Sequence, residues 1–142
     1  MFSTSHFHPM LVHFPIALVV FGFLADSASL FFKKEACLTK TGFYLLIIGT
    51  LSAVAAWLTG VLFTSEMAGI AGEVKETHEM FAVITLGLLI VTSLLRIYLK
   101  AKNKENSGLK WLALLLYGMA TVSVSLTGFY GGNLVYNYMM PL

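Results

Sequence analysis

Charged side chains are scarce in this chain of 142 residues. Asp, Glu, Lys and Arg together make up 11% of the sequence, whereas hydrophobic residues make up 58%. A typical soluble domain is about 25% charged, and a domain of this size cannot bury so much apolar surface in its own core. The composition therefore excludes a soluble enzyme, a nucleic-acid-binding protein and a disordered tail, and it indicates that lipid is the solvent.

Cysteine is almost absent, and so are the common catalytic motifs. The one cysteine, Cys37, cannot form a disulfide within the chain or a cysteine metal cluster. The sequence has no Gly-rich phosphate loop, no nucleophile elbow and no His-Glu-x-x-His motif of zinc proteases. It also lacks the Cys-x-x-Cys-His pattern of covalent haem attachment, so any haem would be of b type. These absences give no sign that the chain is an enzyme by itself.

Four apolar stretches are each long enough to cross a bilayer as a helix, which takes about 20 residues. They cover about residues 9–32, 41–63, 77–99 and 109–132. The connectors between them are short, so we expect neighbouring helices to be antiparallel. The sequence thus predicts one all-α domain over residues 1–142, an integral membrane four-helix bundle whose first partner is the lipid bilayer.

The basic residues are distributed unevenly along the chain. All but one of the nine Lys and Arg lie in or beside the first and third connectors, and the remaining one, Lys75, lies among the glutamates of the second. The positive-inside rule places basic loops in the cytoplasm. We therefore expect a multi-pass protein of the bacterial inner membrane, with both termini and the acidic second connector facing outward.

The two halves of the sequence resemble each other, which suggests an internal repeat of two helices. His13, Ala17 and Gly22 recur at the same spacing as His78, Ala82 and Gly87. Because each half holds two spans, the halves enter the membrane with the same polarity and form a parallel repeat. The match predicts that His13 and His78 lie at similar depth near the outer face and face each other.

Two motifs carry a resemblance to a known family. The run His8-Pro9-Met10-Leu11-Val12-His13-Phe14-Pro15-Ile16 and the later Gly131-Gly132-Asn133-Leu134-Val135-Tyr136 resemble the signatures of domain of unknown function 2231. The resemblance implies a four-span bacterial inner-membrane domain, sometimes joined to cytochrome-like modules, and by analogy it favours redox work. The sequence departs from that pattern at Asn137 and Tyr138, where the family's histidine is expected.

The leading hypothesis is a small redox protein that binds haem b through His13 and His78. His8 is a candidate third ligand or propionate partner. Axial imidazoles and burial would set the potential of such a centre, which would relay electrons to or from a periplasmic cytochrome or a quinol. Structural roles stay open beside these: His13 bonded to a carbonyl freed by Pro15, His78 paired with a carboxylate, and His8 solvated at a helix start.

Other functions are compatible with the same residues. The chain is alternatively a non-enzymatic assembly subunit with structural histidines, or it binds copper, zinc or a quinone at His8, His13 and His78. A homodimer is left open. Asp26 lies too deep to join a histidine site, and we expect it to form a salt bridge with Arg96, Lys33 or Lys34.

Overall fold

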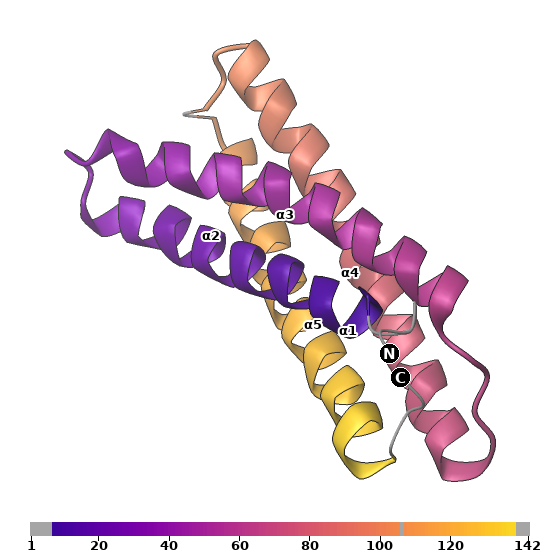
Figure 1. Ribbon diagram of the computed structural model, residues 1–142. Coiled ribbons are helices and arrows are strands. Elements are labelled where there is room, and N and C mark those ends of the chain that lie inside the picture. Colours follow the sequence, from indigo (N-terminus) through magenta and orange to yellow (C-terminus); the bar gives the residue numbers. More distant parts are fainter. Residues whose placement is uncertain (1–6, 106, 139–142) are drawn as a thin grey trace.

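The protein is a bundle of helices over all the residues that its computed structural model describes, 7–105 and 107–138 (Figure 1). The elements are α1 (Phe7–Leu11), α2 (His13–Phe31), α3 (Ala36–Phe63), α4 (Gly69–Ala101) and α5 (Leu109–Asn137). Helices α1 and α2 together form one apolar span, and α3, α4 and α5 form three more. The predicted four-helix membrane bundle is confirmed.

The first span has a short interruption at Val12, where α1 passes into α2. Pro15 has no N–H group and cannot bond back to the carbonyl of Leu11. The backbone hydrogen bonds of the helix continue on both sides of this gap. Val12 N–H donates to His8 O at 3.1 Å, and Ile16 N–H donates to Val12 O at 3.4 Å. The interruption therefore marks a missing hydrogen bond and leaves one continuous span.

Helix α4 begins at Gly69, earlier than the expected start near residue 77. Its first turns are rich in glutamate and therefore resemble a loop in sequence. Lys75 nevertheless lies buried in this segment, because its ammonium bonds to the carboxylates of Glu79 and Glu66. The helix therefore begins in charged turns that precede its apolar, membrane-spanning stretch.

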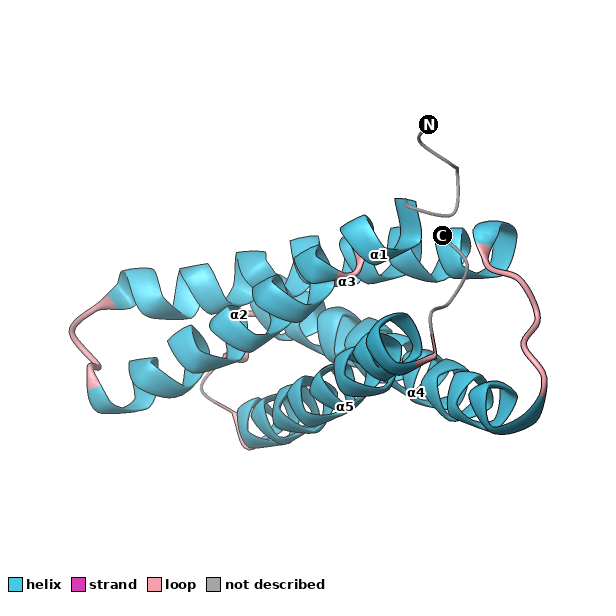
Figure 2. Cartoon of the chain, turned by 60° about the horizontal axis from the view of Figure 1, so that its bottom comes forward, coloured by secondary structure: helices cyan, strands magenta, loops and turns pink. Residues whose placement is uncertain are grey.

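The four spans form two antiparallel hairpins, α1–α2 with α3 and α4 with α5, which lie one upon the other (Figure 2). We call the end with residues 7–11 and the 64–68 connector the histidine end. The end with the 32–35 and 102–108 connectors is the lysine end. Small residues allow the helices to pack closely. A Cβ added at Gly49, Gly118 or Gly128 would lie against Val19, Phe23 or Ile16, respectively.

The buried positions of the two hairpins repeat at a fixed interval. Asp26 and Arg96 are separated by 70 residues, and the same separation relates the other buried residues of α2 to those of α4: Pro15 to Thr85, Val19 to Leu89, and Gly22 to Thr92. Buried residues of α3 and α5 correspond at one residue more: Gly42 to Ala113, Leu46 to Tyr117, Gly49 to Ala120, and Ala53 to Val124. The expected parallel repeat is present in the packing.

The register of this repeat differs from the one that the sequence match suggested. An interval of 70 residues pairs His78 with His8, whereas the match had paired it with His13. The match had also paired Gly22, which is buried against Tyr117, with Gly87, which has open space around it. Identical small residues in two apolar helices need not lie on equivalent faces, and here the pattern of burial identifies the equivalent positions.

A bidentate ion pair joins the two hairpins towards the lysine end. Arg96 Nη1 lies 2.6 Å from Asp26 Oδ2, and Nη2 lies 3.1 Å from Oδ1. Both residues are buried, and the Tyr117 hydroxyl donates to the nearby carbonyl of Gly42 at 3.4 Å. The predicted salt bridge of Asp26 is therefore formed, with Arg96 as its partner.

This pair yields a test of its contribution to stability. Arg96→Met leaves the Asp26 carboxylate buried without a counter-ion, which we expect to lower the free energy of unfolding by about 3–5 kcal/mol. The double variant Asp26→Leu/Arg96→Met removes both charges and should cost less. Thermal unfolding in detergent micelles measures both, with Lys33→Met at an exposed position as the control. Equal losses in the single and double variants would contradict an electrostatic role.

Candidate functional site

Two imidazoles from equivalent positions of the repeat meet at the histidine end. His8 lies on α1 and His78 lies on α4, and their ring centroids are 6.2 Å apart. The rings are nearly perpendicular, with an angle of 84° between their planes. Both rings are half-buried. The fold thus places one histidine of each hairpin in a facing pair.

Each ring is fixed by a hydrogen bond to the backbone of the partner helix in its own hairpin. His8 Nδ1 lies 2.9 Å from the carbonyl oxygen of Ala56, and His78 Nδ1 lies 2.9 Å from that of Thr127. A carbonyl only accepts, so Nδ1 must carry the proton in both rings. In a neutral imidazole the other nitrogen, Nε2, then keeps its lone pair. Both rings are therefore prepared to act as ligands or acceptors through Nε2.

The two anchoring helices seat the rings in the same way. Gly60 and Gly131 each follow the anchoring carbonyl by one helical turn. A Cβ at Gly60 would lie 3.0 Å from Cε1 of His8, and a Cβ at Gly131 would lie 3.0 Å from Cε1 of His78. Glycine at these positions lets an imidazole lie directly on the helix surface. Gly131 belongs to the second sequence motif, which had not indicated this role.

Hydroxyl groups surround the two anchoring carbonyls, and one of them bonds to a carbonyl directly. Thr59 Oγ1 donates to the Ala56 carbonyl at 2.8 Å and lies 3.2 Å from His8 Nδ1. On the other side, Thr127 Oγ1 lies 3.2 Å from Thr85 Oγ1, which in turn lies 2.8 Å from the Ser123 hydroxyl. These threonines and serines were not identified as site residues from the sequence, because single hydroxyls in apolar helices carry no distinctive pattern.

His13 lies outside this arrangement of facing rings. Its side chain is exposed, and Nδ1 lies 2.7 Å from the carbonyl oxygen of Pro9 in the preceding turn. The expected bond to a backbone carbonyl thus exists, although the acceptor precedes the carbonyl freed by Pro15. Among the predicted site residues, the structure brings His8 and His78 together and leaves His13 at the surface of the span.

The spacing of the pair suits a shared metal centre with two protein ligands. Bonds from imidazole nitrogen to zinc are about 2.0–2.1 Å long, so a centroid separation of 6.2 Å is within reach of two imidazoles that share one metal ion. Within residues 7–105 and 107–138, no group of three or more His, Cys, Asp or Glu is placed to hold a metal ion. The described site therefore offers two nitrogens and does not form a closed four-ligand structural site.

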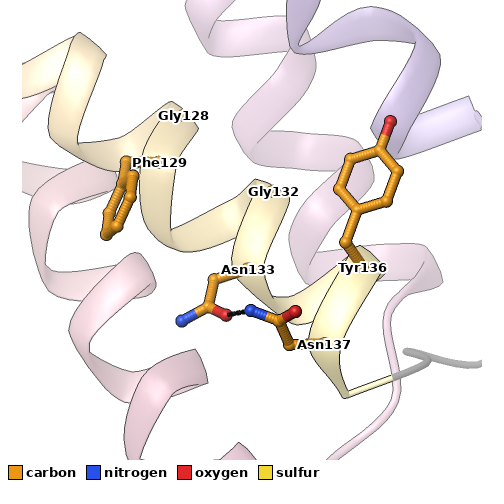
Figure 3. Close-up of a pocket in the computed structure, with 6 residues that line it drawn as sticks. All are labelled: Gly128, Phe129, Gly132, Asn133, Tyr136 and Asn137. Atoms are coloured by element: carbon orange, nitrogen blue, oxygen red, sulfur yellow. Dashed lines mark hydrogen bonds between the residues drawn. The ribbon is translucent and has the colours of Figure 1, made fainter.

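Two surface grooves lie near α5, and neither is lined by the histidine pair. One groove of about 420 Å³ occupies the end of α5, where Asn133 and Asn137 bond to each other and Tyr136 points away from them (Figure 3). The other, of about 880 Å³, is apolar and runs along α5 from Leu126 to Trp111. The histidine pair thus lies outside both grooves.

Comparison with known proteins identifies a family. The family described as "Predicted membrane protein (DUF2231)" matches residues 4–141, which is nearly the whole chain. No curated protein and no solved structure matches.

The seating glycines can be tested directly. Gly60→Ala or Gly131→Ala adds a Cβ that forces the fixed imidazole to move, which we expect to lower the free energy of unfolding by about 1–3 kcal/mol. Gly87→Ala is the matched control, because a Cβ there meets nothing within 4 Å. Thermal unfolding in detergent compares the three variants. A loss in Gly87→Ala as large as in the other two would show that the effect does not come from the rings.

Proposed function

The chain belongs to the DUF2231 family of predicted membrane proteins, and from this premise we propose that it is a small electron-transfer protein that binds one haem b through His8 and His78. The observation that carries the proposal is the facing pair of imidazoles, 6.2 Å apart, with Nδ1 of each ring bound to a backbone carbonyl. Because Nδ1 carries the proton in each ring, Nε2 is the nitrogen of each ring that could bind a shared haem.

The anchoring bonds are those expected around metal-binding histidines. Such a histidine usually donates its other N–H to a carbonyl or carboxylate, which fixes the ring and raises its basicity as a ligand. The carbonyls of Ala56 and Thr127 have this position here. Gly60 and Gly131 hold the rings against α3 and α5. Two protein ligands suffice for haem iron, whose other ligands come from the macrocycle, and the bound group would supply reversible one-electron transfer.

This proposal keeps the binding of haem b but changes one of the two histidines that the sequence suggested as ligands. The sequence suggested His13 with His78, and His8 now takes the first place because its ring faces His78. His13 stays a secondary candidate, since its Nδ1 is also bound to a carbonyl, which leaves Nε2 as the nitrogen that could bind a ligand. Its exposure favours contact with lipid headgroups or a partner over axial ligation.

The orientation of the chain is part of the proposal. The positive-inside rule puts the lysine end in the cytoplasm of a bacterium and the histidine end at the periplasmic face. Val19, Leu46 and Leu89 are fully buried between the two ends. A single centre on one side of this apolar layer would exchange electrons with a periplasmic cytochrome or a quinol, and would act as a relay rather than carry electrons across the bilayer.

A transition metal ion is the second candidate guest. Imidazole nitrogens suit copper and zinc, and the spacing of the two rings also fits a single ion between them. The described residues provide no third ligand in a His, Cys, Asp or Glu cluster. Among ions, one that accepts two nitrogen ligands is therefore favoured.

The visible spectrum of the protein tests the proposal. We expect the full chain, purified from haem-replete cells, to show a Soret band. His8→Ala and His78→Ala should each abolish this band, because each would remove one of the two protein nitrogens that hold the haem, whereas His13→Ala should retain it. A folded and colourless preparation would refute haem binding. Stoichiometric copper or zinc by elemental analysis in such a preparation would favour the second candidate.

A further inference from the structure

A buried lysine lies beside the histidine pair and has no role in holding the rings. Lys75 is only 6% exposed, which is unusual for lysine unless its charge is paired. Its Nζ lies 2.7 Å from Glu79 Oε1 and 3.4 Å from Glu66 Oε1. The side chains of Glu66 and Glu79 are 95% and 54% exposed. The carboxylates are thus far more exposed to water than the lysine side chain is.

The position of this cluster on α4 couples it to the ligand. Lys75 precedes His78 by three residues, so both side chains lie on the same face of the helix. Glu79 directly follows His78. Both charges act on the His78 imidazole electrostatically and with opposite sign. Because Lys75 is shielded from solvent, its field is less screened than that of a surface charge.

Among the described residues, the charged groups that act electrostatically on His78 are Glu79 and Lys75, both on α4. The residues of α3 that contact His8 are Ala56, Thr59 and Gly60, and those of α5 that contact His78 are Thr127 and Gly131. All of these are uncharged. Within residues 7–105 and 107–138, the charges that act on the pair thus come from the first turns of α4, and Glu66 in the connector before it binds one of them.

We infer that Lys75 and Glu79 tune, in opposite directions, the reduction potential of the redox centre held by His8 and His78. The inference rests on the proposed function. A nearby positive charge stabilises the reduced centre, which carries one more electron, and a negative charge stabilises the oxidised centre. Lys75 raises the potential, and Glu79 lowers it. Neither residue touches the guest as a ligand, so both act through the field at the site.

A purely structural role for the cluster makes a different prediction. Lys75 also ties the 64–68 connector to α4 through Glu66. If that were its whole function, removal of either charge would change stability and leave the potential unchanged. The sign of the shift in potential therefore separates the two roles.

The experiment is a redox titration of the haem-loaded full chain. We expect Lys75→Gln to lower the midpoint potential, Glu79→Gln to raise it, and Lys75→Arg to stay close to the unmodified protein. Glu76→Gln is the matched control, because it removes the same charge from an exposed position on the face of α4 that points away from His78. Its shift should be smaller than that of Glu79→Gln and should vanish at high salt.

The outcomes separate this inference from the proposed function. If the unmodified chain binds haem but Glu79→Gln gives no upward shift, the tuning role is overturned. The same conclusion follows if the Lys75 and Glu79 variants shift in the same direction. Because Glu79 is half exposed, its variant should fold even where Lys75→Gln does not. A chain that binds no redox centre would overturn the proposed function itself, and this inference with it.

Discussion

A polar group inside a bilayer has no water to bond, so each one must find its partner within the protein. Across the described residues, no buried side-chain nitrogen or oxygen lacks a hydrogen-bond partner. The partners change along the bundle, from imidazole with carbonyl at the histidine end, through hydroxyl with hydroxyl, to guanidinium with carboxylate. A slip of one helix by a single residue would break several of these contacts at once. The polar pairs therefore fix the register in which the apolar surfaces pack.

Much of the architecture was predictable because hydropathy and length alone define a membrane span. The Asp26–Arg96 pair was also predictable, since a charge inside a span needs a counter-charge at similar depth. The histidine pair was harder to predict. His13 and His78 share a local sequence match, but helices that face lipid tolerate many apolar residues, so identity does not report which face is buried. The period of buried positions does, and it was visible only once the helices were packed.

The early start of α4 was missed for a related reason. Glu73, Lys75, Glu76 and Glu79 together resemble a solvated connector in sequence. In the structure these turns are helical, and the one cation among them is buried by its own carboxylates. Local composition describes how a segment interacts with water. It does not show whether a neighbouring segment supplies a partner for a charged side chain. Here the connector supplies Glu66, which pairs with Lys75.

The repeat gives the site a symmetry that its surroundings do not share. His8 and His78 have the same anchor, and each rests on a glycine one turn beyond it. At the interval of 70 residues, however, Glu79 of α4 corresponds to Pro9 of α1. Proline suits the first turn of a helix, whereas glutamate brings charge and holds Lys75 beside the ring. Because the described charge lies on one side only, substitutions in α4 alone can change the field at the histidine pair, while the geometry of both rings is preserved.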